Sequence, residues 1–273
     1  MFQSSRRKSG LGSALALSEL IYHSIVRSVR KSHGNALMAI ATNVLQSIIM
    51  VMVFYLMFSI LGLRGSALRG DFLLYIMTGI FLFMTHTKVV GAVVGAEGPA
   101  SPMMNHAPMN TVVAISAAAL GSLYIQLVSL FVILFVYHVA VTPVVIDQPI
   151  GAFGMLLLSW FTGVAIGLVF LAAKPWFPGF VAIAVIIFQR ANMLASGKMF
   201  VVNSMPSFML AMFDWNPLFH TIDQARGFTF INYYPRHTST EYPLYVGLAL
   251  LMIGLMGEYY TRHRASLSWS ARL

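Results

Sequence analysis

Six long runs of apolar residues alternate with shorter polar stretches along the chain. A helix needs about 20 residues to cross a bilayer, so runs of this kind predict membrane-spanning helices. The predicted spans are residues 36–63, 72–96, 111–141, 150–173, 179–196 and 244–260. An even number of spans returns the chain to the side on which it begins. The pattern therefore predicts an all-α integral membrane protein, with residues 1–273 forming a single transmembrane domain.

The segment before the first span has a helical period of its own. Within residues 13–31, apolar side chains recur on one face and polar ones on the other: Leu17, Leu20, Ile21, Ile25 and Val29 against Glu19, His23, Arg27, Arg30 and Lys31. This pattern predicts an amphipathic helix lying in the cytoplasmic interface, within an N-terminal segment of residues 1–35. The alternative is that this segment is only an ordinary basic flank of the first span. That would explain its charges but not the helical period of its apolar residues.

The fifth span is interrupted by polar residues. Its apolar run is followed by Gln189, Arg190 and Asn192. An arginine that faces lipid costs several kcal/mol, so Arg190 is expected to face a polar interior or to reach outward to the interface. Short, interrupted spans often lie beside transport routes.

Within the segment of residues 197–243, the stretch 213–243 is too polar to span a membrane and too weakly charged to be a tail. One short helix is expected after Pro206 and a second over residues 217–226, because Asn216 can cap it, Pro217 suits the first turn and Gly227 can end it. The second helix has two faces, with Asp223 and Arg226 spaced to form an exposed ion pair.

Aromatic residues flank this second helix, namely Trp215, Tyr233, Tyr234 and Tyr242. Such a density is typical of membrane–water interfaces. Residues 197–243 are therefore expected to form a cap that contains two short helices and lies at the outer side of the membrane that the chain spans.

The loop at residues 97–110 contains three prolines. Pro102 can start a single helical turn and Pro108 can end it, which predicts a short rigid knuckle on the cytoplasmic side.

Small residues are paired at helical spacing in two spans, at Gly91 and Gly95 and at Gly163 and Gly167. This spacing allows close helix packing. For the first pair we favour packing inside one subunit over a dimer seam.

Composition excludes a soluble globule, because 58% of residues are hydrophobic, 9% are charged and the mean hydropathy is +0.78. The net charge of +9 is concentrated near the two ends of the chain. Basic flanks favour the cytoplasm, so both termini, including the tail at residues 261–273, are predicted to be cytoplasmic. The expected location is a bacterial inner membrane. This distribution of charge does not indicate a nucleic-acid partner. The absence of cysteine excludes disulfides, thiolate metal sites and thiol catalysis.

The usual catalytic motifs are absent. There is no G-x-x-x-x-G-K-[ST], G-x-G-x-x-G, H-E-x-x-H or G-x-S-x-G sequence, and the eight histidines are scattered. We therefore expect no enzyme activity, no catalytic residues, no metal site and no cofactor in this chain. The spans also lack the acidic residues of a proton-coupled carrier, so energy for transport would come from another polypeptide.

The tract Trp215-Asn216-Pro217-Leu218-Phe219-His220, followed by Asp223 and Arg226, resembles a segment after span five in the capsular polysaccharide export permeases. These are permease subunits of ATP-binding-cassette exporters of the ABC-2 type. The order of an interfacial helix, six spans, a proline-rich loop and a helical outer segment is similar too. The basic segment before span one lacks the aromatic residues usual in O-antigen members, which favours the capsule branch.

The resemblance implies the ABC-2 or type V exporter fold and a permease that moves a lipid-linked capsular polysaccharide. It further implies a homodimer that encloses a channel, with two copies of a separate nucleotide-binding ATPase that holds ATP and Mg²⁺. Periplasmic and outer-membrane export proteins are possible further partners.

The resemblance also implies three groups of functional residues. The ATPase-coupling group is Arg27, Arg30, Lys31, Glu97, Met103, Met104, Asn105 and His106. The substrate-path group is Tyr75, Tyr124, Gln126, Trp160, Gln189 and Arg190. The outer-gate group is Trp215, Asn216, Pro217, His220, Asp223, Arg226, Tyr233 and Tyr234. Each aromatic residue has the alternative of facing lipid or belonging to the interfacial belt.

Two other functions stay open at this stage. The same fold could export O-antigen, teichoic acid, a lipid or a drug, or the chain could be a membrane scaffold that transports nothing.

Overall fold

The computed structural model describes residues 19–26, 36–60, 62, 70–96 and 111–270. Among these residues all regular structure is helical. Residues 19–26 form one short helical piece, and the remaining elements are α2 (Ala36–Ile60), α3 (Phe72–Val94), α4 (Thr111–Ala140), α5 (Pro149–Ala173), α6 (Pro178–Ala195), the 3-10 helix η3 (Val202–Ser204), α7 (Ser207–Phe213), α8 (Pro217–Thr229) and α9 (Glu241–Ser270).

Six of the described helices are long and apolar enough to cross a membrane: α2, α3, α4, α5, α6 and α9. The prediction of an all-α integral membrane protein is therefore confirmed, and the span limits agree to within a few residues. The largest difference is in α9, which begins at Glu241 and continues to Ser270. It starts early because Pro243 falls in its first turn, where a missing N–H is harmless, and it continues because the basic residues after the span sustain a helix.

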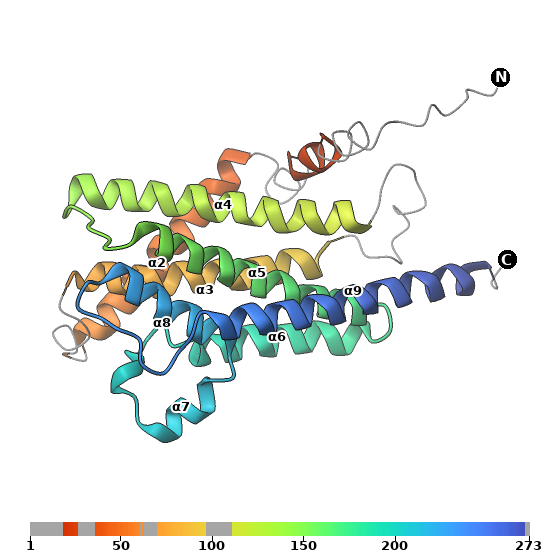
Figure 1. The fold of residues 1–273 in the computed structure, drawn as a ribbon. Coiled ribbons are helices and arrows are strands. Elements are labelled where there is room, and N and C mark those ends of the chain that lie inside the picture. Colours follow the sequence, from red (N-terminus) through yellow and green to blue (C-terminus); the bar gives the residue numbers. More distant parts are fainter. Residues whose placement is uncertain (1–18, 27–35, 61, 63–69, 97–110, 271–273) are drawn as a thin grey trace.

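The helices form an elongated bundle with α3 at its centre (Figure 1). In its most apolar window 78% of the α3 residues are buried, the highest share among the six spans. α3 packs against α5, α4, α2 and α8, while α9 covers α5. Figure 1 places α4 on one side, α3 and α5 in the middle, and α6 and α9 on the other, with α7 projecting from the bundle.

The start of α3 is fixed by Asp71. Its carboxylate Oδ1 accepts hydrogen bonds from the backbone N–H of Leu73 at 2.9 Å and of Leu74 at 3.4 Å, which is an N-cap. Its Oδ2 accepts from the Tyr137 hydroxyl at the end of α4 and from the Thr142 hydroxyl at 3.0 Å. One carboxylate thus joins the beginning of α3 to the end of α4.

Glycine allows α5 to lie directly against α3. A Cβ added at Gly163 would lie 2.5 Å from Val89 Cγ1 and 2.8 Å from the His86 carbonyl oxygen. One added at Gly167 would lie 2.9 Å from Val93 Cβ. This second small-residue pair therefore produces close packing inside the chain, as its spacing allows.

The first pair behaves differently. A Cβ at Gly91 would meet its nearest atom, Gln189 Nε2, at 3.6 Å, and at Gly95 the nearest atoms belong to α3 itself. This pair therefore allows no unusually close helix approach within the chain, and both glycines line a hollow. The choice between packing inside one subunit and a dimer seam stays a prediction.

The helical piece at residues 19–26 supports the predicted amphipathic period. Leu20, Ile21 and Ile25 are partly buried, whereas Glu19 and His23 are exposed. The basic end of the predicted helix lies outside the described residues, and its place in the membrane interface stays a prediction.

Substitution of Gly163 tests the α3–α5 contact. Gly163→Ala should lower the thermal midpoint of the protein in detergent, by a destabilisation of about 1–3 kcal/mol, because the new methyl group meets a backbone oxygen that cannot move aside. Gly154→Ala on the same helix is the control, since nothing lies within 4 Å of its added Cβ. Equal midpoints for the two variants would contradict the packing described here.

Candidate functional site

Helix α8 lies inside the bundle, packed against α5 and α3 (Figure 1). Leu218, Phe219 and Ile222 are each 0% exposed, and the polar Asp223 and Arg226 are equally buried. The expectation of a helix exposed at the surface is therefore wrong for α8, whereas its place at the outer side of the membrane stays a prediction. The amphipathic pattern was misleading because the polar face is satisfied by other parts of the same chain rather than by water.

The predicted N-cap of α8 is confirmed. Asn216 Oδ1 accepts a hydrogen bond from the Leu218 N–H at 3.0 Å, and Pro217 occupies the first turn. The other side of the Asn216 amide donates to Asn192 Oδ1 at 2.7 Å and to the Ala195 carbonyl at 3.1 Å. One side chain thus starts α8 and fastens it to the end of α6.

The predicted end of α8 at Gly227 is wrong, because the helix continues to Thr229. Gly227 is required for packing, since a Cβ there would lie 2.6 Å from Pro235 Cδ.

Arg226 satisfies the backbone that follows α6. Its Nη1 donates to the carbonyls of Gly197 at 3.0 Å and Phe200 at 2.6 Å, and its Nη2 donates to the Lys198 carbonyl at 2.6 Å. The guanidinium carbon lies 4.1 Å from the centroid of the Tyr75 ring, a cation–π contact. The expected exposed pair between Arg226 and Asp223 is wrong: both groups are buried, and each binds other partners.

Asp223 holds the loop that follows α8. Its Oδ1 accepts from the Tyr233 hydroxyl at 2.5 Å and its Oδ2 from the Thr238 hydroxyl at 2.7 Å. Burial raises the pKa of Asp223, while the two hydroxyl donors and the nearby Arg226 charge oppose that shift. The carboxylate therefore ties residues 233 and 238 back onto the helix.

His220 joins two further loops. Its Nδ1 accepts from the Ser239 N–H at 3.1 Å, so Nε2 carries the proton and donates to the Asp214 carbonyl at 2.6 Å. Burial lowers the pKa of His220, which favours this neutral form.

The outer-gate residues are thus divided by the structure. Six lie together in and around α8: Asn216, Pro217, His220, Asp223, Arg226 and Tyr233. Trp215 and Tyr234 are 61% and 79% exposed, as expected for the interfacial belt. Their role as a gate stays a prediction.

Lys198 is a buried cation that sequence reasoning missed. It is 3% exposed, its Nζ donates to the Met193 carbonyl at 2.9 Å, and it lies 3.4 Å from the centroid of the Phe83 ring. Burial lowers the pKa of Lys198 to about 7. The position of this lysine directly after the interrupted apolar run of the fifth span was the sequence feature that could have indicated a buried cation.

The substrate-path residues have separate surroundings. Tyr75 is buried beneath Arg226, Gln126 Nε2 donates to Asn43 Oδ1 at 3.0 Å, and Trp160 Nε1 donates to the Ala119 carbonyl at 3.0 Å. Tyr124 is 50% exposed on α4. On α6, Gln189 Nε2 donates to the Thr87 carbonyl at 3.4 Å and Arg190 is exposed. Their part in a substrate route stays a prediction.

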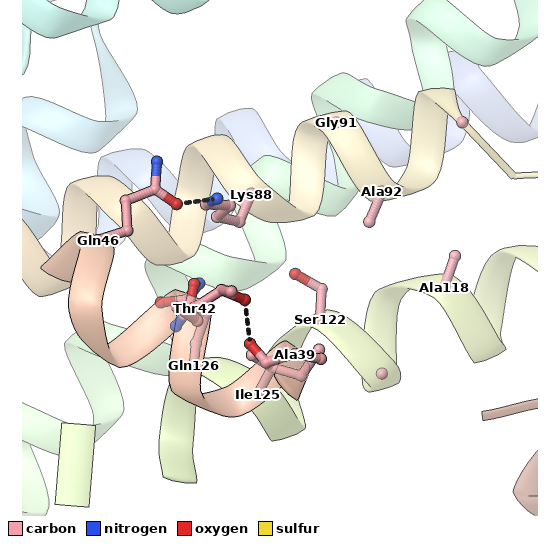
Figure 2. A pocket seen from close by; sticks show the side chains of 13 residues that line it. Ala39, Thr42, Gln46, Lys88, Gly91, Ala92, Ala118, Ser122, Ile125 and Gln126 are labelled. Carbon is pink, nitrogen blue, oxygen red and sulfur yellow. Dashed lines mark hydrogen bonds between the residues drawn. The ribbon is translucent and has the colours of Figure 1, made fainter. Parts of the chain in front are cut away.

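A hollow of about 380 Å³, lined by both polar and apolar residues, lies between α2, α3 and α4 (Figure 2). It is at the end of the bundle where α2 and α4 begin and α3 ends. Its lining consists of Ala39, Thr42, Asn43, Gln46, Lys88, Gly91, Ala92, Gly95, Ala118, Gly121, Ser122, Ile125 and Gln126. We call it the α2–α3–α4 pocket.

All the predicted ATPase-coupling residues lie outside the described residues, namely Arg27, Arg30, Lys31, Glu97, Met103, Met104, Asn105 and His106. Their role stays a prediction. In the described ranges no group of three or more His, Cys, Asp or Glu side chains could hold a metal ion.

The six candidate spans around a buried central helix define an all-α polytopic membrane protein. No family model matches this chain. It is 25% identical over 202 residues to the polysialic acid transport protein KpsM of Escherichia coli, covering 72% of this chain and 76% of that protein. A second Escherichia coli protein of that name is 25% identical over 218 residues, covering 77% and 82%. These similarities support the capsular polysaccharide export permease family, as the tract from Trp215 to Arg226 indicated.

The pH dependence of stability tests the burial of Lys198. Its pKa is about 7 in the folded protein and about 10.4 in an unfolded chain. Between these values the unfolded lysine keeps a proton that the folded one has lost, so stability should rise with pH from about 7 to about 10. The thermal midpoint in detergent should show this rise, and Lys198→Met should reduce it. Lys174→Met, at the end of α5, is the control that should keep the rise of the unsubstituted protein.

Proposed function

We propose that this chain is the transmembrane permease subunit of an ATP-driven exporter that moves a lipid-linked capsular polysaccharide across the bacterial inner membrane. The observation that carries this proposal is the similarity to two KpsM transport proteins over about three quarters of the chain. The six candidate spans and the absence of a phosphate-binding loop in the sequence agree with a transport subunit whose ATPase is a separate polypeptide. ATP and Mg²⁺ would then bind to that partner.

Exposure along α6 supports a homodimer. Only 17% of its most apolar window is buried within the chain, the lowest share among the six spans. The same helix carries Arg190 exposed, which would be costly against lipid. Two copies whose α6 helices face a common water-filled route would remove that cost. We therefore assign Gln189 and Arg190 to the wall of the route.

The links between α6 and α8 support a gate that moves as one unit. Asn216 binds the last turn of α6, and Arg226 binds the three carbonyls that follow it. A displacement of α6 would therefore carry α8 with it. Docking of the ATPase on the knuckle at residues 97–110 would deliver such a displacement through α3, which contacts both helices.

The same fold with another cargo is the nearest alternative. O-antigen, teichoic acid, a lipid or a drug would need the same six spans, and a non-transporting scaffold would need no ATPase at all. A gene for an ATPase beside this one, together with polysaccharide synthesis genes, would separate these possibilities.

Deletion of the gene tests the proposed export. Cells that lack this chain should lose surface polysaccharide and accumulate the polymer inside, and a plasmid copy should restore the surface polymer. Fractionation followed by quantification of polysaccharide in each fraction measures this. Normal surface polymer in the deletion strain would contradict the function.

The double variant Met103→Asp, Met104→Asp tests coupling to the ATPase. Two carboxylates on a proline-stiffened knuckle should weaken a docking contact, so the complex should lose cargo-dependent ATP hydrolysis while the chain inserts normally. Met109→Asp, at the edge of the same loop, is the matched control. Unchanged coupling in the double variant would place the ATPase elsewhere on the chain.

Cysteine labelling tests the orientation. The chain has no cysteine, so Ser4→Cys and Ser270→Cys each introduce a single thiol. Both should resist a membrane-impermeant reagent added outside intact cells and react once the membrane is opened, because the basic ends favour the cytoplasm. Labelling of either thiol from outside would refute cytoplasmic termini.

A further inference from the structure

Among the described residues that line it, the α2–α3–α4 pocket has one positive charge and no carboxylate. Lys88 is the one charged side chain among the residues that line it, and its Nζ donates to Gln46 Oε1 at 2.6 Å. In the part of the chain that the structure describes, no carboxylate forms an ion pair with Lys88. A partly buried lysine is costly unless a negative group or water compensates it, so the pocket is set up for an anion.

The floor of the pocket is closed by hydrogen bonds that leave the lysine available. Gln126 Nε2 donates to Asn43 Oδ1 at 3.0 Å, and Asn43 Nδ2 donates to the Ser129 hydroxyl at 2.9 Å. These three buried side chains hold α2 against α4 and satisfy one another. They make a rigid polar base that does not need a ligand for its own hydrogen bonds.

The rim of the pocket supplies donors. Figure 2 shows the Ser122 hydroxyl pointing from α4 into the space between α4 and α3, across from the segment of α3 that carries Lys88. Lys88 has three N–H donors, of which Gln46 uses one. The glycines Gly91, Gly95 and Gly121 keep the walls free of side chains, which leaves about 380 Å³ for a ligand. This volume falls within the usual range for small-molecule sites.

The lining favours a compact anion over a sugar ring. No aromatic side chain is among the described residues that line the pocket, so there is no face on which a sugar could stack. A phosphate group, by contrast, accepts several hydrogen bonds and carries a negative charge that can pair with the positive charge of Lys88.

The surroundings of the pocket favour a lipid as the carrier of that phosphate. The outward surface of α2 beside it is apolar and exposed, with Met38 at 57% and Leu45 at 58% exposed. The pocket also lies near one end of the bundle, and the ends of spanning helices are where lipid headgroups are expected. An acyl chain can therefore lie along α2 while the headgroup enters between α2, α3 and α4.

We propose that the α2–α3–α4 pocket binds the phosphate group of an anionic membrane lipid through Lys88 and Ser122. Phosphate esters occur both in ordinary phospholipids and in the lipid part of lipid-linked sugars, and the pocket chemistry suits either source. The proposal does not depend on the cargo assigned above, because it concerns a lipid bound to the resting protein.

Native mass spectrometry of the purified full chain with added lipids tests this proposal. The probes are phosphatidylglycerol, which is anionic, and phosphatidylcholine, which has a compensating positive charge. The unsubstituted protein should retain phosphatidylglycerol preferentially. Lys88→Gln should weaken that binding by about tenfold or more, the effect of losing one charge-assisted hydrogen bond.

Two further variants keep the test decisive. Lys174→Gln is the matched control, because this lysine lies at the same end of the bundle but donates to the Val94 carbonyl outside the pocket. It should bind phosphatidylglycerol like the unsubstituted protein. Ser122→Leu should block the pocket from α4 and lower binding without removing a charge. Equal phosphatidylglycerol binding by the unsubstituted protein and Lys88→Gln, both with unchanged thermal midpoints, would overturn the proposal.

Two added arms identify the source of the phosphate. Protein purified from cells with and without polysaccharide synthesis should carry a co-purified phospholipid in both cases if the source is the bulk membrane, and a different lipid only in the first case if the source is the cargo. Inorganic phosphate is added as a competitor. Full occupancy by inorganic phosphate, with no preference for either lipid, would overturn the assignment to a lipid. A failure of export in the deletion test would leave these binding results unaffected.

Discussion

Unpaired backbone groups inside a membrane are the constraint on which this structure depends. A helix that ends at membrane depth leaves carbonyl oxygens without donors, and lipid cannot supply them. Helix α6 ends at Ala195, and the carbonyls of residues 197, 198 and 200 that follow it receive their hydrogen bonds from the buried Arg226. Because that arginine belongs to α8, the end of α6 requires α8 to lie inside the bundle.

The spans could be predicted from the sequence because a long apolar run that crosses a bilayer forms a helix. The buried position of α8 could not be predicted, because the sequence of its polar face is the same whether water or buried groups form hydrogen bonds with it. Asp223 and Arg226 at a spacing of three suggested an exposed pair, whereas each is paired with groups far along the chain: Tyr233 and Thr238 for the first, residues 197–200 for the second. Contacts of this kind depend on tertiary structure, which no local pattern records.

The candidate site also combines local features that the sequence predicted with tertiary contacts that it did not. The cap by Asn216 is local and was predicted, while its second bond to Asn192 joins α8 to α6 and was not. Lys198 and Lys88 were not selected as site residues because a single lysine has no motif. The first proved to be enclosed by aromatic rings and the second to line a polar pocket, and both facts required the packing of α3 against its neighbours.

The glycine contacts between α5 and α3 have a consequence for motion. Backbone and side chains are already in contact at Gly163 and Gly167, so we expect α3 and α5 to move together. The hollow between α2, α3 and α4 is less tightly packed, so a joint displacement of α3 and α5 would change its shape. A lipid headgroup bound in the hollow would resist such a change of shape.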